Sequence, residues 1–343
     1  MRAMVLNGPN QPFEKVQRPD PAAGPGEAVA RVVTCGSGLT IQHAKAGRRK
    51  IAFPRIIGHE ITGEIVEVGA GVTSLKPGDP VTAYFYLNCG HCRYCLSQLE
   101  PLCSNGGGQV GLNCDGGYAE YIKLPAHIFI RLPDGLDWKK HPAEIGVVTD
   151  ALATPYKVLR RARVKSGETV AVIGAGGGLG IHQVMMAKWA RTRVIAVDTK
   201  SSKFDACRKA GADEVVDASQ GRVTEQLLEL TRGEGVDVVI DYVSATSTLE
   251  AGARALGRCG RLVTLGGSGQ TFQASAADLL NKEQELLGSR YVTRTEIMDC
   301  LELVARGEVF PLVTVLRPLE EAEAVHDLVE RGEVIGRAAL RVA

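Results

Sequence analysis

Excess charge, long apolar runs and repetition are all scarce in this sequence. The 343 residues carry a formal net charge of only +1, which argues against a surface built to bind nucleic acid or an anionic membrane. The longest apolar runs fall short of the length that spans a bilayer. The first residues have neither the apolar core nor the cleavage site of a secretory signal, so we expect the protein in the cytoplasm.

The composition is that of an ordinary globular protein. Hydrophobic residues make up 45% and charged residues 23%, and a chain of 343 residues typically forms two domains with sizeable cores. Of the nine cysteines, four are bunched and five are scattered. Such a distribution suits a reducing compartment better than a disulfide framework.

A glycine-rich turn between residues 169 and 190 is the strongest local signal. Residues 169–173 form a short β-branched run typical of a strand buried on both faces. Residues 179–190 have helical spacing. A turn at this junction favours a pyrophosphate bound at a helix N-terminus. The pattern reads GxxGGxG, with a leucine at the last position of the usual GxGxxG, and its candidate cofactor-binding residues are Gly174, Gly176, Gly177, Gly178, Leu179 and Gly180.

A second apolar run, residues 193–197, ends on Asp198, twenty residues after Gly178. A carboxylate there accepts hydrogen bonds from the ribose hydroxyls of NAD and repels the extra phosphate of NADP. The sequence therefore predicts NAD as the cofactor. Lys203 is a further candidate cofactor-binding residue, and Gly266 and Gly267 are expected beside the nicotinamide.

The sequence pattern predicts one domain inserted into another. Short, glycine-punctuated strands fill the N-terminal part, whereas strands and helices alternate from about residue 149, which predicts a doubly wound parallel sheet. After about residue 288 β character returns, with a last strand at 335–342. We therefore predict an α/β protein with a β-rich domain at 1–150 and 289–343, a dinucleotide-binding domain at 151–288, and an active site in the cleft between them.

Four cysteines follow the spacing C-x2-C-x2-C-x7-C. Four thiolates at this spacing suit a tetrahedral zinc ion, and a site without an open position is structural rather than catalytic. Disulfides and an iron–sulfur cluster are the alternatives, and neither fits a reducing compartment or the remaining sequence as well. The predicted ligands of one zinc ion per subunit are Cys89, Cys92, Cys95 and Cys103.

Taken together, these motifs resemble the zinc-containing alcohol dehydrogenases of the medium-chain dehydrogenase/reductase superfamily. Besides the cysteine loop and the glycine turn, the resemblance rests on the segments 58–60 (GHE), 76–79 (KPGD) and 115–120 (DGGYAE). It implies a GroES-like catalytic domain, a Rossmann domain, and a homodimer or homotetramer. It also implies hydride exchange between NAD and the carbinol carbon of a small-molecule substrate.

The catalytic zinc of the family is where this chain departs from the pattern. Gapless alignment places Gly38 at the position of the ligand cysteine and Ile41 at that of a bracing aspartate, while His59 and Asp150 match the two other ligands. Glycine offers no donor. Either Cys35 supplies the thiolate from a rearranged loop, which the gapless alignment disfavours, or zinc binds weakly or not at all.

The resemblance also implies roles for other residues. Thr40 and His43 match positions that pass a proton between substrate, cofactor ribose and solvent, and Glu60 is expected behind the site. Arg337 matches a position that can touch the cofactor phosphates.

Three functions fit these observations. The first is an NAD-dependent dehydrogenase of the family with one structural zinc and an altered catalytic centre. The second is a zinc-independent ene-type reductase of an activated, CoA-linked substrate, since loss of a Lewis acid disfavours simple alcohols. The third is a cofactor-binding pseudoenzyme, against which the retained Thr40, His43, His59 and Asp150 weigh.

Overall fold

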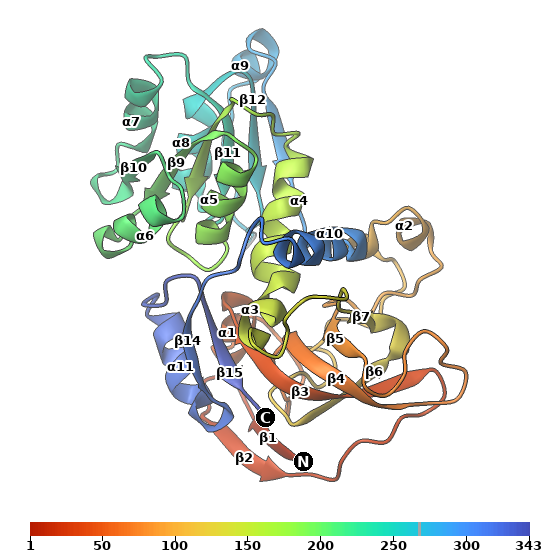
Figure 1. Ribbon diagram of the computed structural model, residues 1–343. Coiled ribbons are helices and arrows are strands. Elements are labelled where there is room, and N and C mark those ends of the chain that lie inside the picture. Colours follow the sequence, from red (N-terminus) through yellow and green to blue (C-terminus); the bar gives the residue numbers. More distant parts are fainter. Residues whose placement is uncertain (267–268) are drawn as a thin grey trace. The chain divides into compact units, whose positions relative to one another are not determined.

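The chain divides into two compact units in a computed structural model that describes residues 1–266 and 269–343. One unit comprises Met1–Ala153 and Val292–Ala343, and the other comprises Thr154–Tyr291 (Figure 1). The sequence placed these boundaries at 150/151 and 288/289. Gly267 lies outside the described residues.

The unit Thr154–Tyr291 is built on a six-stranded sheet whose neighbouring strands are all parallel. The strand order is β10-β9-β8-β11-β12-β13, the order of a Rossmann fold. This confirms the doubly wound parallel sheet. Its strands are β8 (Thr169–Ile173), β9 (Arg193–Asp198), β10 (Glu214–Asp217), β11 (Val236–Asp241), β12 (Leu256–Thr264) and β13 (Glu285–Gly288).

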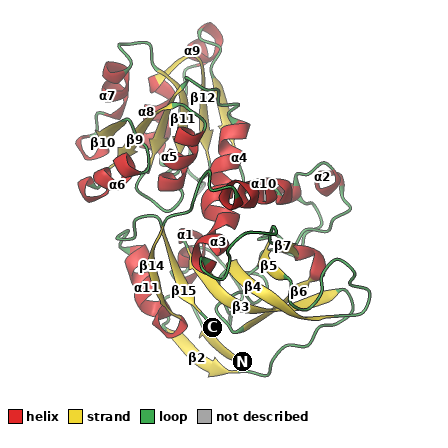
Figure 2. Ribbon diagram, viewed as in Figure 1, coloured by secondary structure: helices red, strands yellow, loops and turns green. Residues whose placement is uncertain are grey.

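Helices cover this sheet, as Figure 2 shows. Because both faces are covered, the central strands are almost wholly apolar: Val170, Ala171 and Val172 of β8 have no exposed surface. The helices are α4 (Ala153–Arg161), α5 (Gly180–Trp189), α6 (Phe204–Lys209), α7 (Val223–Leu230), α8 (Thr246–Ala255) and α9 (Ala276–Asn281).

The other unit contains a seven-stranded sheet and a two-stranded ribbon, β1 with β2. The long strand β3 is central, pairing with β15, β4 and β6. The pairs are antiparallel except β14 with β15, which is parallel. The strands are β1 (Arg2–Leu6), β2 (Phe13–Gln17), β3 (Glu27–Ser37), β4 (Glu60–Val68), β5 (Pro80–Ala83), β6 (Tyr121–Pro125), β7 (Phe129–Arg131), β14 (Val313–Pro318) and β15 (Arg337–Arg341).

Sequence reasoning missed two helices in this unit, α10 (Arg294–Ala305) and α11 (Ala322–Glu330), where it expected only β structure. The first has a readable signal, because Thr293 and Glu296 form a capping box at its start. The second buries Val325 and Val329, four residues apart on one face. The shorter helices are α1 (Leu39–Lys45), α2 (Arg93–Leu96) and α3 (Pro142–Val147), followed by a π-helical turn, η3 (Val148–Leu152).

None of the helices in the described part of the chain is long and apolar enough to cross a membrane.

We predict that Gly180→Ala destabilises the protein, although alanine favours helices. A Cβ added to Gly180 would lie 2.0 Å from the carbonyl oxygen of Gly174, so backbone must move, at a cost of about 1–3 kcal/mol. Denaturant unfolding measures this. The matched control is Gly288→Ala, where nothing lies within 4 Å of the added atom. Equal stability of the two variants would contradict the close approach of α5 to the end of β8.

Candidate active site and metal centre

The glycine turn and Asp198 lie side by side at the ends of two paired strands. Parallel pairing of β8 with β9 brings them together. The N–H of Gly176 donates a 2.8 Å hydrogen bond to Oδ2 of Asp198, and the N–H of Lys200 donates to Oδ1 at 3.0 Å. A carboxylate beside a helix N-terminus at the point where the strand order reverses is the arrangement that binds a dinucleotide.

The turn itself is tightly folded. Gly174 has a φ of +78°, a conformation that favours glycine, and its carbonyl oxygen accepts a 3.1 Å hydrogen bond from the N–H of Gly177. Leu179 occupies the N-cap position of α5, without a capping hydrogen bond from its side chain. The carbonyl oxygen of Gly178 accepts a 2.7 Å hydrogen bond from Nδ1 of the buried His182, a contact that the sequence motif did not indicate.

Two further cofactor candidates lie near strand ends of the same unit. The side chain of Lys203 packs on Gly176, where an added Cβ would be 2.5 Å from Lys203 Cδ. Burial lowers the pKa of Lys203, and the charge on Asp198 opposes this shift. Gly266 follows β12, and its N–H donates a 2.9 Å hydrogen bond to Oγ of Ser244.

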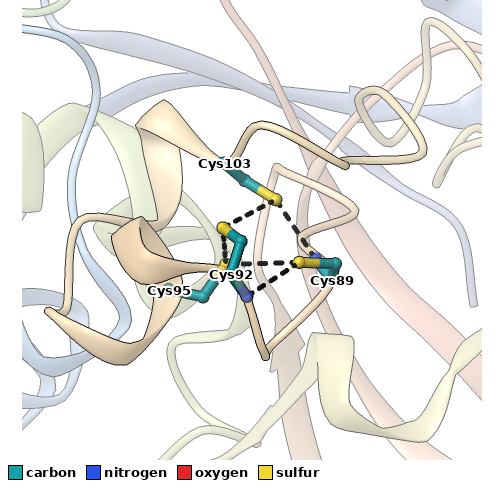
Figure 3. A group of neighbouring side chains, drawn as sticks. All are labelled: Cys89, Cys92, Cys95 and Cys103. Atoms are coloured by element: carbon teal, nitrogen blue, oxygen red, sulfur yellow. Dashed lines mark hydrogen bonds between the residues drawn. The ribbon is translucent and has the colours of Figure 1, made fainter.

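The four clustered cysteines converge on one point, as Figure 3 shows. Three sulfur–sulfur distances within the cluster are 3.5 Å (Cys92–Cys95) and 3.9 Å (Cys89–Cys95 and Cys92–Cys103). A tetrahedral zinc ion with Zn–S bonds of about 2.3 Å holds its sulfurs about 3.8 Å apart. The backbone N–H of Cys89 also points at the sulfur of Cys103, at 3.3 Å. The donor set and its spacing fit a structural zinc ion.

The thiols of this cluster need a cation to ionise together. Backbone N–H groups, first that of Cys95, lower the pKa of Cys92 to about 5. Burial, followed by the neighbouring thiols, raises the pKa of Cys95 to about 12. The pKa values of these two neighbours are thus shifted in opposite directions, and a bound Zn²⁺ would supply the charge that keeps all four cysteines as thiolates.

A second cluster lies in the β-rich unit and consists of His59, Glu60 and Asp150. Their donor atoms lie within 4.8 Å of one another, and all three residues are buried. Nε2 of His59 is 3.9 Å from Oδ2 of Asp150. Glu60 starts β4, and Asp150 lies in the π-helical turn η3, an irregularity often found at functional sites. The ring of Phe85 covers His59, with 4.2 Å between centroids.

The guanidinium of Arg337 is inserted into this second cluster. Its Nη2 donates to Oε1 of Glu60 at 2.8 Å and to Oδ2 of Asp150 at 2.7 Å, and its Nε donates to the same Glu60 oxygen at 3.1 Å. Burial alone would lower the pKa of Arg337, but the charges on Glu60 and Asp150 outweigh it and raise the pKa. The cluster therefore already contains a permanent cation.

Gly38 makes room for that cation. A Cβ added to Gly38 would lie 2.7 Å from Nη1 of Arg337. The guanidinium thus reaches the space into which a cysteine at position 38 would project its side chain. The position that carries the ligand thiol in the alcohol dehydrogenases is here next to a positive charge.

Cys35 does not join the cluster. Gly36 is the residue of β3 that faces Glu60, and side chains alternate along a strand. The sulfur of Cys35 packs instead near Gly58 and Gly117, whose added Cβ atoms would lie 2.7 and 2.9 Å from it. Burial raises the pKa of Cys35 well above its usual range. No thiolate is offered at this site.

The residues present therefore do not fit the catalytic zinc that the resemblance implies. Two of the three usual zinc ligands, His59 and Asp150, remain, but the carboxylate of Asp150 is hydrogen-bonded to Arg337. Nδ1 of His59 and Oε2 of Glu60 are buried without a hydrogen-bond partner among the residues described. Burial raises the pKa of Glu60, and the charge on Arg337 opposes that shift. The cluster is polar, incompletely satisfied and centred on an organic cation.

The two candidates for proton transfer lie on the short helix α1, which begins directly after Gly38. Thr40 is half-buried and His43 is exposed. Nδ1 of His43 accepts a 2.7 Å hydrogen bond from Nε of Arg48, and Arg48 binds Glu330 of α11 through two hydrogen bonds of 2.6 Å. Sequence reasoning missed both Arg48 and Glu330, because no motif connects positions 282 residues apart.

We expect the purified protein to carry one zinc ion per chain and Cys92→Ser to lose it. Metal analysis together with thermal unfolding measures this, because ligand loss removes binding free energy that stabilises the fold. Cys259→Ser is the control, since Cys259 is an exposed free cysteine outside the cluster. Retention of zinc by Cys92→Ser, or its loss from Cys259→Ser, would contradict the assignment.

Comparisons with known proteins agree with this geometry. A family model for the alcohol dehydrogenase GroES-like domain matches residues 24–134, and one for zinc-binding dehydrogenases matches residues 178–306. The chain is 34% identical over 345 residues to an alcohol dehydrogenase of Geobacillus stearothermophilus, covering 100% of both chains. It is 31% identical over 349 residues to an acryloyl-coenzyme A reductase of Metallosphaera sedula, covering 99% of both.

The same agreement extends to solved structures. The crystal structure of the alcohol dehydrogenase of Aeropyrum pernix matches with a TM-score of 0.90 and 32% identity, over 100% of both chains. Likeness over the full length of both chains, at this identity, establishes the relationship. The chain belongs to the zinc-binding alcohol dehydrogenase family of the medium-chain dehydrogenases/reductases.

Proposed function

We propose that this protein exchanges a hydride between NAD(H) and an alcohol or ketone at a centre whose fixed cation is Arg337 rather than a catalytic zinc. The observation that supports this proposal is the position of the guanidinium between Glu60 and Asp150, in the space left by Gly38. NAD(H), when bound, donates or accepts the hydride. The glycine turn holds its phosphates and Asp198 its adenosine ribose.

Arg337 has one nitrogen left for a ligand. Nε and Nη2 are engaged by Glu60 and Asp150, whereas Nη1, beside Gly38, has no hydrogen-bond partner in the described part of the chain. A substrate oxygen that accepts a hydrogen bond from Nη1 would meet a buried positive charge. Such a donor stabilises the negative charge that develops on the oxygen as the hydride moves.

Thr40 would complete the site on the proton side. Thr40 lies two residues after Gly38, on the same helix as His43, and its hydroxyl can both donate and accept a hydrogen bond. A hydrogen-bonding cation polarises a substrate less than a Lewis-acid metal does. We therefore infer a preference for carbonyl or hydroxyl groups activated by a neighbouring group.

A second candidate is reduction of a conjugated double bond in an activated, CoA-linked substrate. The same observation favours it, because the oxygen of an enoyl thioester would accept a hydrogen bond from Nη1 while the hydride adds to the β-carbon, and a proton from water would then add to the α-carbon. A relative with 31% identity is named an acryloyl-coenzyme A reductase. Product analysis separates the two candidates: the first yields an alcohol from a ketone, the second a saturated thioester.

From the family we also infer a homodimer or homotetramer located in the cytoplasm, and light scattering of the purified protein would measure the assembly.

Asp198→Ala is expected to shift cofactor preference toward NADPH. The wild-type carboxylate repels the 2′-phosphate of NADPH and binds the ribose hydroxyls of NADH. We predict at least a tenfold fall in the ratio of kcat/KM for NADH to that for NADPH, about 1.4 kcal/mol. Asp205→Ala, at an exposed carboxylate of α6 paired with Arg208, is the control. An unchanged ratio in Asp198→Ala would count against the proposed cofactor site.

Arg337→Met tests the proposed cation. Its removal leaves Glu60 and Asp150 buried without a cation, which costs about 3–5 kcal/mol of unfolding free energy, and it takes away the donor for the substrate oxygen. We predict a marked loss of both stability and turnover, measured by denaturant unfolding and steady-state kinetics.

Arg341→Met, at an exposed arginine of the same strand β15, should behave as wild type. If Arg337→Met folds and keeps the wild-type kcat, the role given to the guanidinium is wrong.

A further inference from the structure

A continuous chain of hydrogen bonds runs from the buried end of β3 to His43. Oγ of Ser37 contacts the hydroxyl of Tyr118, which lies 2.9 Å from Nε2 of His326. Nδ1 of His326 lies 2.5 Å from Oε1 of Gln42, and Nε2 of Gln42 donates to Glu330 at 2.7 Å. From Glu330 the chain continues through Arg48 to His43.

Chemistry fixes the direction of every bond in the buried half of this chain. A carboxylate only accepts, so Gln42 donates to Glu330 with its amide nitrogen and accepts with its oxygen. His326 must then donate from Nδ1 and accept the proton of Tyr118 at Nε2. Burial lowers the pKa of His326 to about 3, which keeps its ring neutral as this pattern requires.

The same argument fixes the tautomer of His43. Hydrogen bonds from Arg48, and then from Gln42, lower the pKa of Glu330 to about 2, so a full negative charge holds the guanidinium in place. Arg48 Nε can only donate, so Nδ1 of His43 must be the acceptor. The proton of a neutral His43 ring therefore sits on Nε2.

We propose that Arg48 and Glu330 are positioning residues that hold His43 as a neutral hydrogen-bond donor, whose Nε2–H binds an oxygen of the cofactor or substrate instead of accepting a proton. This inference rests on the proposed function. The exposed imidazole then has a binding role, because Nδ1, the only ring nitrogen with a lone pair for a proton, already accepts a hydrogen bond from Arg48.

The charges around His43 support the same state. Partial burial of the ring, followed by the charge on Arg48, lowers the pKa of His43, and Arg49 adds to this effect. The carboxylate of Glu330, on the facing helix α11, raises it. The balance keeps the ring neutral at neutral pH.

Nitrogen-15 NMR of histidine-labelled protein saturated with NADH tests this proposal, with His43→Gln used to assign the signal. Wild-type His43 should show a protonated Nε2, an unprotonated Nδ1 and a pKa below 6.5. Arg48→Met should give a mixture of tautomers and a pKa above that of the wild type, because the charge on Arg48 no longer lowers it. Glu330→Gln, which removes the anchoring charge, should also give a mixture of tautomers, but it should lower the pKa of His43, because the carboxylate of Glu330 raises that pKa.

Arg331→Met is the matched control. This arginine follows α11, pairs with Glu333 and is not one of the residues in the chain of hydrogen bonds described above. Its spectrum at His43 should match the wild type. A wild-type His43 protonated on Nδ1, or a tautomer and pKa unchanged in Arg48→Met, would overturn the proposal.

Kinetics give a second readout. Because a mixture of tautomers leaves about half of the His43 rings with a proton on Nε2, Arg48→Met should raise a KM about twofold. A rise in KM for NADH identifies the cofactor as the acceptor, and a rise in KM for the substrate identifies the substrate. An unchanged KM for both would also overturn the proposal. Calorimetric binding of NADH tests the proposed function separately, because the tautomer can be observed whether or not the protein turns over.

Discussion

The ion pairs between the Arg337 guanidinium and the carboxylates of Glu60 and Asp150 are the constraint on which the candidate active site depends. Two buried carboxylates close to one histidine would repel each other without a cation. In alcohol dehydrogenases with a catalytic zinc the metal supplies that charge. Here the start of β4, the turn η3 and strand β15 supply the carboxylates and the cation together, and the missing side chain of Gly38 leaves the cation the space it needs. The glycine at position 38 therefore goes with a different way of balancing charge in this cluster.

The cofactor half of the chemistry rests on local geometry. Few sequences meet the three requirements of this geometry. They are a strand buried on both faces, a turn with a left-handed glycine, and a helix that begins close to that turn. The carboxylate of Asp198 is part of this turn through its hydrogen bond with Gly176. We propose that the residue that sets selectivity for NAD over NADP also organises the backbone of the turn.

Much of this architecture could be predicted from the sequence, because its signals are local. Strand β8 was predicted with the bounds the structure shows, and the spacing of Cys89, Cys92, Cys95 and Cys103 indicated their convergence. Helices α10 and α11 were missed, although Thr293 and Glu296 carry a capping signal. The contacts of Arg337 and His43 could not have been found in this way. Residues 277 and 282 positions apart meet only through tertiary packing, and a motif records the type of a residue but not its partners.

We propose that a guanidinium takes the place of a metal ion at the second cluster. Anomalous diffraction at the zinc edge, from crystals grown with saturating NADH and added zinc, would locate every bound zinc ion. We predict one anomalous peak per chain, among the four cysteine sulfurs, with guanidinium density bridging Glu60 and Asp150. A second peak within bonding distance of His59 and Asp150, with Arg337 turned away, would contradict it.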